Sequence, residues 1–579
     1  MQRGSAPFRG RTGGGLVQRA PMPDFITLAL HPTPPYIPPM QTFAALLERL
    51  VLTPSRNAKL QLIIDYLRHT PDPSRGWAIA AITGDLSIPS VKPAAVRELV
   101  AARVDPVLFQ LSYDYVGDLA ETISLIWPPR PGANRSPDLG EVVETLMEST
   151  KAEGLRLTES WLDALNSTGR WALLKLVTGG LRIGVSARLA RQALADFGKV
   201  DVSEIEELWH GLAAPYIDLI AWLEGRAPKP IASALSPFRP PMLAHPLLDK
   251  TERMEAQEID PSRISPADFA AEWKWDGVRV QLVADQGVRR LYTRNGDDIS
   301  HAFPDLLEAA DFNAALDGEL LIRSPTGGVA SFNELQQRLN RKTVTPKQMA
   351  ERPAMLRAYD IMQEGAEDLR PLPFVERRKR LERFVVTLDN PRIDLSALIP
   401  FADATSLEDL RANPPTREIE GLMLKRWTSA YVPGRPAGQW YKWKRNPFLV
   451  DAVLMYAQRG HGKRSGLYSD FTFGVWRNTA EGEELTPVGK AYFGFTDDEL
   501  TQLDKYVREN ERERFGPVRS VIANADQGLV LEVAFEGLQR SPRHRSGLAM
   551  RFPRIHRIRW DKPSREADRI ETLEALLSD

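Results

Sequence analysis

The chain of 579 residues contains no cysteine. Disulfide bonds and thiolate metal sites are therefore excluded. The phosphate-binding pattern G-x-x-x-x-G-K-[S/T] is also absent, so a bound nucleotide must be held by something other than a Walker loop. The longest stretch without Asp, Glu, Lys or Arg, residues 25–47, contains five prolines and cannot form a membrane helix. We expect a soluble cytoplasmic protein that does not enter the membrane.

The formal net charge of −1 offers no global attraction to a polyanion, so nucleic acid would have to meet local basic patches. One such patch lies between Arg540 and Lys562, where seven arginines and one lysine face a single acid, Asp561. A solvated surface is the plain alternative, but this excess favours binding of nucleic acid or a triphosphate. Residues 1–24 are rich in Gly and Arg. We expect residues 1–39 to be a disordered extension, with a misassigned start or a transit peptide as alternatives.

The length predicts roughly three or four domains of ~150 residues each. Apolar positions at helical spacing start at Phe43 and continue to about Leu235, which predicts an all-helical domain over residues 40–235. The proline-rich segment 236–243 marks a boundary. Strand patterns then predict an α+β domain over residues 236–445. After Asn446-Pro447, short β segments predict a small barrel of the OB type over residues 446–579.

Alternating side chains predict the individual strands of the two C-terminal domains. Residues 278–284 and 288–294 flank Asp285-Gln-Gly287, which predicts a hairpin. Further strands are predicted over residues 315–322, 355–361, 419–425, 440–444, 450–456, 468–476 and 529–535, with a helix over residues 374–384.

The run E-W-K-W-D-G over residues 272–277 places Lys274 in an apolar strand between two tryptophans. A free lysine has a pKa of ~10.4 and is almost wholly protonated at neutral pH. Apolar neighbours and nearby cations would lower that pKa, so the run predicts a covalent nucleophile. Strand alternation puts Glu272 on the same face as Lys274. A solvated lysine on an edge strand is the alternative.

Five more motifs follow in order: L-D-G-E-L at 316–320, A-Y-D-I at 358–361, E-G-L-M-L-K at 420–425, W-Y-K-W-K at 440–444 and R-F-P-R at 551–554. With the lysine motif, they resemble the ordered motif set of ATP-dependent DNA ligases. The resemblance extends from about Met40 to the C-terminus. The overall domain plan looks most like that of bacterial and archaeal ligases with an N-terminal DNA-binding domain. It implies a nucleotidyltransferase (adenylation) domain before the OB-type barrel. NAD-dependent ligases carry a four-cysteine zinc finger that this chain cannot build.

The resemblance implies that the enzyme seals 5′-phosphate/3′-hydroxyl nicks in duplex DNA through a lysine–AMP intermediate, and that it is a monomer. Lys274 would attack the α-phosphorus of ATP. Glu319 and Glu420 lie among apolar neighbours and could converge on Mg²⁺, with Mn²⁺ as a second candidate ion and solvated acids as the alternative. Lys442 and Lys444 alternate with aromatic residues, so both could face the α-phosphate and depress the pKa of Lys274.

Tyr359 is expected to stack on adenine, although a core aromatic is the usual alternative. Arg551 and Lys562 match the family motif that grips the β- and γ-phosphates, which implies that the C-terminal domain swings over ATP and away again. The other candidate nucleotide-binding residues are Glu272, Arg279, Arg294 and Arg435.

The turn over residues 179–186 exposes glycine N–H groups at a helix start beside two arginines, which suits a phosphate; a plain connection between helices is the alternative. The predicted DNA-binding residues are Gly180, Arg182, Gly184, Ser186 and Arg188. RNA ligases and mRNA-capping guanylyltransferases share the lysine motif, and a non-enzymatic nick-binding protein is a third alternative. The helical domain and the R-F-P-R motif favour a DNA ligase acting on nicked duplex DNA.

Overall fold

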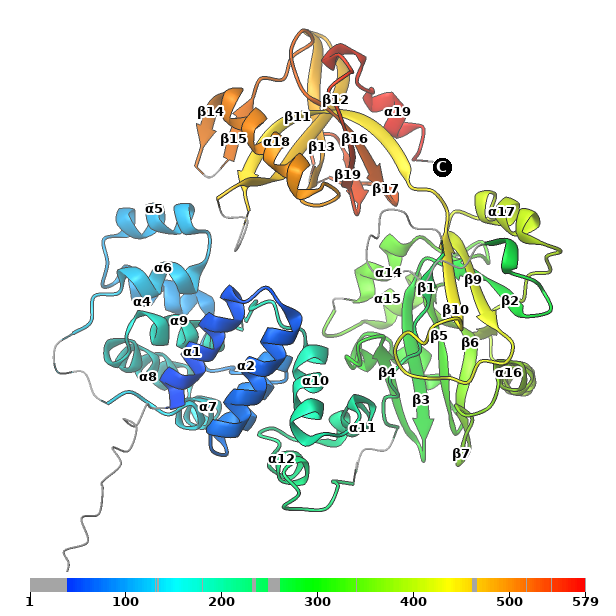
Figure 1. Cartoon of the computed structure of the whole chain (residues 1–579), viewed down its shortest axis with the longest axis horizontal. Helices are drawn as coiled ribbons and strands as arrows, with labels where there is room; N and C mark the ends of the chain where they lie inside the picture. The colour runs from blue at the N-terminus through cyan, green and yellow to red at the C-terminus, as the bar shows by residue number, and fades with distance from the viewer. Residues whose placement is uncertain are drawn as a thin grey trace, which may run out of the picture.

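The computed structural model describes residues 39–577, except residues 131, 133–134, 180, 232–235, 248–260, 340, 461–465, 517 and 543. Almost all of the expected N-terminal extension, and Gly180 of the predicted DNA-binding turn, therefore lie outside the described residues. Three structural regions follow one another along the chain (Figure 1). Within the part of the chain that is described, no helix is long and apolar enough to cross a membrane.

The N-terminal region is helical, as the apolar spacing predicts. Its helices are α1 (Pro39–Leu52), α2 (Arg56–His69), α3 (Ser74–Thr83), α4 (Pro93–Ala101), α5 (Pro106–Val116), α6 (Leu119–Ile126), α7 (Leu139–Glu148), α8 (Lys151–Ala164), α9 (Ser167–Thr178), α10 (Ala187–Gly198), α11 (Val202–Leu208) and α12 (Ile217–Leu223), with a 3₁₀ turn, η1 (Trp209–Gly211). One core of buried apolar side chains runs through them, starting with Phe43 and Leu47 of α1. Ser186 caps the N-terminus of helix α10, and its hydroxyl accepts a hydrogen bond from the Leu189 N–H.

The central region contains two sheets. One has four strands in the order β1 (His245–Pro246), β10 (Trp440–Lys444), β9 (Ile419–Arg426) and β2 (Phe269–Trp275). The other has six, β4 (Val288–Thr293), β3 (Val278–Asp285), β5 (Ala314–Ile322), β6 (Ala354–Glu364) and β7 (Glu367–Asp368) in that order, with β8 (Ile393–Leu395) paired to β6. The helices are α13 (Pro304–Glu308), α14 (Phe332–Leu339), α15 (Pro346–Glu351), α16 (Phe374–Leu388) and α17 (Ala404–Ala412), with 3₁₀ turns η2 (Pro261–Arg263) and η3 (Ser300–Ala302).

The registers of these strands bring the predicted motifs together. Lys274 on β2 pairs with Gly421 on β9, so it lies beside the E-G-L-M-L-K motif. Arg279 on β3 pairs with Glu319 on β5. The predicted hairpin between β3 and β4 forms as expected, with Gln286 and Gly287 both at positive φ (48° and 81°), the conformation that a two-residue turn requires.

The C-terminal region is built on a curved sheet of seven strands. Its strands are β11 (Phe448–Arg459), β12 (Tyr468–Thr479), β13 (Gly482–Ala491), β14 (Glu511–Phe515), β15 (Val518–Val521), β16 (Val530–Phe535) and β19 (Arg554–Arg559). A separate ribbon pairs β17 (Gly537–Arg540) with β18 (Leu548–Arg551), and the helices are α18 (Asp497–Glu509), the 3₁₀ turn η5 (Ser564–Glu566) and α19 (Ile570–Glu574). Among the described strands, no ladder joins β13 or β14 to β19. A backbone hydrogen bond of 3.1 Å from the Ile555 N–H of β19 to the carbonyl oxygen of Phe493, just after β13, nevertheless links these two segments. The structure therefore shows a C-terminal β domain that forms part of a barrel.

Candidate active site

A cavity of about 730 Å³ opens beside the strand that carries Lys274. Residues from both central sheets line it, together with one residue from the C-terminal region. The predicted residues in its wall are Glu272, Lys274, Arg279, Arg294, Glu319, Tyr359, Arg435 and Lys442. Phe552, in the R-F-P-R motif, is the residue contributed by the C-terminal region. Side chains that lie far apart in the sequence thus share one cavity.

Lys274 lies among carboxylates. Its ammonium group donates a hydrogen bond to Glu420, which is also 3.7 Å from the ammonium group of Lys444. Burial acts to lower the pKa of Lys274, but the negative charges of Glu420, Glu319 and Asp276 outweigh burial and raise that pKa. The expectation that paired lysines depress the pKa of Lys274 is therefore wrong for this arrangement, because the fold places acids beside Lys274. The nucleophile is held as an ammonium ion while Glu420 and Glu319 face it.

The two predicted metal ligands differ in charge. Burial opposes ionisation of Glu420, but the ammonium groups of Lys274 and Lys444 lower its pKa to about 2. Burial raises the pKa of Glu319 to about 8, against the opposing charge of Lys274, and the negative charge of Glu420 contributes to this rise. No group of three or more His, Asp or Glu side chains suited to a metal occurs among the described residues. Two carboxylates fit an ion such as Mg²⁺, which binds few protein oxygens and keeps water and phosphate oxygens as ligands.

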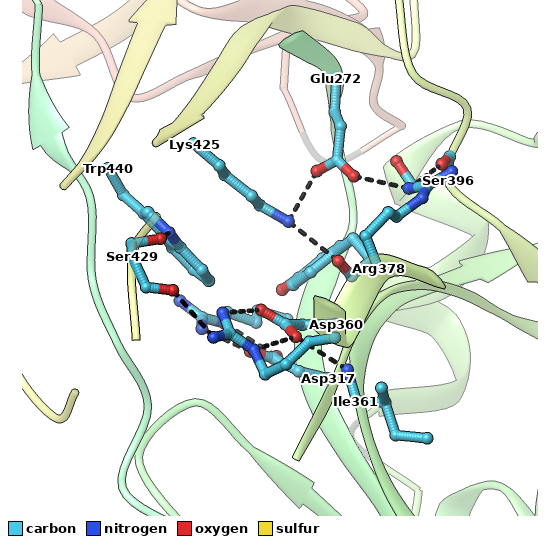
Figure 2. A network of polar contacts seen from close by, with 12 residues as sticks. Glu272, Asp317, Asp360, Ile361, Arg378, Ser396, Lys425, Ser429 and Trp440 are labelled. Atoms are coloured by element: carbon cyan, nitrogen blue, oxygen red, sulfur yellow. Dashed lines mark hydrogen bonds and ion pairs between the residues drawn. The ribbon is translucent and has the colours of Figure 1, made fainter. Parts of the chain in front are cut away.

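One end of the cavity is aromatic and carries a single buried carboxylate. Tyr359 and Trp440 line this end, and the ammonium group of Lys425 lies 4.4 Å and 4.9 Å from the centres of their rings. Lys425 is 2.7 Å from one carboxylate oxygen of Glu272, and Arg378 donates a hydrogen bond of 3.0 Å to the other (Figure 2). The three charged side chains are at most 5% exposed.

The buried network of Figure 2 continues beside this end of the cavity. Arg279, 17% exposed, donates to both oxygens of Asp317, at 3.1 Å and 2.6 Å. Burial opposes the charge of Arg279, but Asp317 raises its pKa well above the usual value. A second fork joins Arg377 to Asp360, and both of these side chains are fully buried. Arg279 therefore has its strongest partner inside the protein, and only part of its guanidinium group faces the cavity.

The mouth of the cavity is cationic. Arg294, Arg435 and Lys442 line it. Within the described part of the chain, neither Arg294 nor Arg435 has an acidic side chain within ion-pair distance. Burial and the charges of Arg279, Arg435 and Arg188 lower the pKa of Arg294. Guanidinium groups in this setting suit phosphate, which accepts several charge-assisted hydrogen bonds.

Residues of the R-F-P-R motif reach the catalytic domain. Arg551 donates a hydrogen bond to Asp276, and its guanidinium group stacks 4.0 Å from the centre of the Phe332 ring on α14. Phe552 has a φ of 52°, which is rare for a residue other than glycine, and this conformation directs the chain at the cavity wall. Phe552 was not among the residues predicted from the sequence. The sequence feature that could have indicated Phe552 is its position beside Arg551 in the R-F-P-R motif.

Lys562 lies elsewhere. Its ammonium group is 2.7 Å from Asp451, which also bonds Arg559, and it is not among the residues that line the cavity. The structure therefore brings Arg551 to the cavity and leaves Lys562 within the C-terminal region.

The basic patch over residues 540–562 is less charged in the fold than in the sequence. Acidic side chains from other segments neutralise much of it. The pairs are Arg545 with Glu484, Arg551 with Asp276, Arg554 with Glu536, and Arg559 and Lys562 with Asp451. A count of charges along this segment overestimates its positive charge, because acidic side chains that are distant in the sequence lie beside its arginines in the fold.

The predicted DNA-binding turn connects α9 with α10. Gly184 has a φ of 67°, and its carbonyl oxygen accepts a hydrogen bond of 2.7 Å from Lys59 of α2, a residue that was not predicted from the sequence. Arg182 is exposed, and Arg188, 52% exposed, lies 3.3 Å from Glu206. Lys59 thus anchors the turn through Gly184, while Arg182 in the turn and Arg188 in the first turn of α10 are exposed.

Comparison with known proteins places the chain in a family. The family model described as "ATP dependent DNA ligase domain" matches residues 241–444, and the one described as "ATP dependent DNA ligase C terminal region" matches residues 464–562. A "Probable DNA ligase" of Koribacter versatilis is 32% identical over 436 residues, which cover 70% of this chain and 71% of that protein. The chain belongs to the ATP-dependent DNA ligase family. Its members are enzymes that seal nicks in duplex DNA with ATP through a lysine–AMP intermediate, and this excludes a non-enzymatic binding protein.

More distant relatives match nearly the whole chain. A "DNA ligase" of Thermococcus fumicolans is 27% identical over 564 residues, which cover 92% of this chain and 97% of that protein. A solved structure titled "Pmar-Lig_Pre." shares the fold with a TM-score of 0.55 at 16% identity, over 90% of this chain and 99% of that one. The match therefore includes the helical region as well as the two regions that follow it.

Proposed function

We propose that the cavity is the self-adenylylation site of this ligase and that Lys274 is its nucleophile. The observation that carries this proposal is the position of Lys274 in a cavity with aromatic rings at one end and arginines at its mouth. The lysine nitrogen would form a bond to the α-phosphorus of ATP while the bond to the pyrophosphate oxygen breaks, giving a phosphoramidate and free pyrophosphate. Lys274 must first lose a proton. Glu420, Glu319 and Asp276 are near enough to influence that loss.

We assign the adenine to the aromatic end of the cavity. Tyr359 and Trp440 offer rings for stacking. Glu272 can accept a hydrogen bond, and adenine presents an amino group where guanine presents a carbonyl oxygen. Burial raises the pKa of Glu272, while the positive charges of Lys425 and Arg378 oppose that rise and orient its carboxylate, so we propose that this side chain selects adenine. The hydrogen-bonded pair of Arg279 and Asp317 stabilises the cavity wall at this end.

We assign the triphosphate to the cationic end. Lys442 and Lys444 would face the α-phosphate, while Arg294 and Arg435 stand at the mouth. Glu319 and Glu420 would hold Mg²⁺ or Mn²⁺, and a bound divalent ion supplies charge neutralisation for the departing pyrophosphate. Binding of a cation by these carboxylates would also remove the negative charges that raise the pKa of Lys274.

We propose four segments and a closing motion. The segments are residues 1–39 (extension), 40–235 (DNA binding), 236–445 (adenylation) and 446–579, the last being a barrel of the OB type. The Arg551–Asp276 contact indicates that the last domain can close over the cavity, and further rotation would carry Lys562 towards the phosphates. Because residues of both domains meet within one chain, we propose a monomer.

Labelled nucleotide tests the site directly. Incubation with α-labelled ATP and Mg²⁺ should leave label on the wild-type protein, and peptide mapping should find it on Lys274. Glu319→Gln and Glu420→Gln should each lower labelling and shift its dependence on Mg²⁺ concentration. Label on Lys425 or Lys442 instead would refute the assignment of the nucleophile.

A further inference from the structure

The loop after β4 has two faces. Thr293, Arg294, Asn295 and Asp297 line the nucleotide cavity on one face. The other face packs on the helical domain. A Cβ atom added to Gly296, whose φ is 90°, would lie 3.0 Å from Nε2 of His210 in η1. The residues that form one wall of the catalytic cavity therefore rest against the domain assigned to DNA binding.

His210 is the centre of this contact. Its ring lies 4.7 Å from the ring of Tyr292 on β4 and 5.6 Å from that of Phe238, centre to centre. Nε2 is buried and has no hydrogen-bond partner in the described part of the chain. Burial and the charge of Arg191 lower the pKa of His210, so the ring is neutral and packs as an aromatic side chain.

An ion pair and a buried arginine lie beside this aromatic contact between the two domains. Glu207 of α11 accepts a hydrogen bond of 2.5 Å from Arg370 of the adenylation region. Arg191 of α10 is 6% exposed; burial lowers its pKa, while Glu206, Asp85 and Asp297 act to raise it. Asp297 belongs to the cavity loop, so the loop carries a negative charge that acts on Arg191 across this contact.

Helix α10 also carries Arg188 to the mouth of the cavity. Nη2 of Arg188 lies 3.9 Å from the position that a Cβ atom on Gly434 would take, and Gly434 precedes Arg435. Arg188 is one of the charges that act on Arg294. Three arginines from two domains therefore converge at one place, and only Arg188 has an acidic neighbour, Glu206 at 3.3 Å, among the described residues. In Figure 1, α10 and α11 are the helices of the N-terminal region that face β4.

We propose that the helical domain forms part of the phosphate-binding end of the active site, with Arg188 supplying a third guanidinium group and His210 positioning the loop that carries Arg294. The inference rests on the adenylation site proposed above and gives the helical domain a role beyond DNA affinity. The ligand is a phosphate group, either of ATP or of the 5′ end at the nick. Three guanidinium groups suit a doubly charged phosphate better than two.

The test compares Arg188→Ala with Arg68→Ala, both in the full-length enzyme. Arg68 is a matched control: it is 54% exposed and lies 3.5 Å from Asp65, whereas Arg188 is 52% exposed and lies 3.3 Å from Glu206. One assay measures label transfer from ATP without DNA. The other measures sealing of a nick that already carries AMP, at saturating DNA. Wild-type activity in both assays establishes the underlying site independently of either substitution.

We expect Arg188→Ala to lose roughly 10- to 100-fold in one of the two assays, the size of a charge-assisted hydrogen bond, and Arg68→Ala to match the wild type in both. Loss of label transfer identifies a phosphate of ATP, and loss of sealing alone identifies the nick phosphate. His210→Ala should reduce the same step, and His210→Phe should restore it because the ring stacking is retained. If Arg188→Ala equals the wild type in both assays, the proposal is overturned.

Discussion

Replacement of Glu272 by Gln tests the buried charge network that supports the adenine end of the cavity. The two side chains have nearly the same volume, so the change removes a charge without opening a cavity. Arg378 would keep Glu382 at 2.7 Å and the Ser396 carbonyl at 2.7 Å. Among the described residues, Lys425, 1% exposed, would keep the Tyr359 carbonyl oxygen at 3.1 Å and three aromatic rings but no carboxylate within ion-pair distance.

The substitution therefore leaves Lys425 as a buried cation without its carboxylate. Breaking a buried ion pair in this way costs about 3–5 kcal/mol. A cooperative unit of 150–250 residues loses about 2–4 °C of melting temperature per kcal/mol, so the expected shift is about 6–20 °C. Glu376→Gln is the matched control on α16, since the Glu376–Lys379 pair is 50% and 62% exposed and such pairs contribute about 0–1 kcal/mol.

A double-mutant cycle identifies the cause. Lys425→Met alone should cost less than Glu272→Gln, because Glu272 keeps Arg378 as a partner. Adding Lys425→Met to Glu272→Gln should recover stability, with a coupling energy of roughly 2–3 kcal/mol. Scanning calorimetry measures the stabilities, and competition between labelled ATP and GTP measures base selection, which Glu272→Gln should weaken because an amide can also donate to guanine. Additive losses in the cycle, or unchanged base selection, would refute the reasoning.

The assigned roles give three further predictions. Lys274→Ala should abolish the labelled adduct while far-ultraviolet circular dichroism stays that of the folded wild type, because the side chain borders a cavity and is 24% exposed; a labelled, active variant would contradict this. Arg551→Ala should lose adenylylation far more than sealing of a nick that already carries AMP, because Arg551 contacts Asp276 beside the nucleophile; equal losses would contradict a step-specific role. An N-terminal deletion starting at Ser236, which removes Arg188 and His210, should form lysine–AMP no faster than Arg188→Ala does. It should bind nicked DNA weakly, with a salt dependence of log K that is shallower by about 0.9 for each DNA phosphate that the helical domain neutralises in the full-length enzyme. Equal affinity and slope for the two proteins would show that the helical domain is not the DNA clamp.

Local patterns in the sequence were sufficient for the secondary structure of the catalytic region. Alternation over residues 278–294 predicted the hairpin of β3 and β4, and the order of short motifs predicted the family. Both signals are local, because strand periodicity and turn chemistry involve neighbouring residues. The roles of Lys274, Glu319 and Glu420 stay predictions, but the structure places Lys274 and Glu319 in one cavity wall and Glu420 in hydrogen-bond contact with Lys274.

The amino-acid sequence specifies which residue types are available, whereas the fold specifies what surrounds each of them. The pKa of Lys274 rises, contrary to expectation, because β5 and β9 bring two carboxylates beside it. The patch over residues 540–562 is largely neutralised by acids from other strands, and Lys562 lies against Asp451, away from the cavity. The ladders of the C-terminal sheet form part of a barrel. Electrostatic energy depends on the distance between charges in space, which their spacing along the chain does not reveal. In the same way, only the fold shows that His210 and Arg188 of the helical domain adjoin the catalytic cavity.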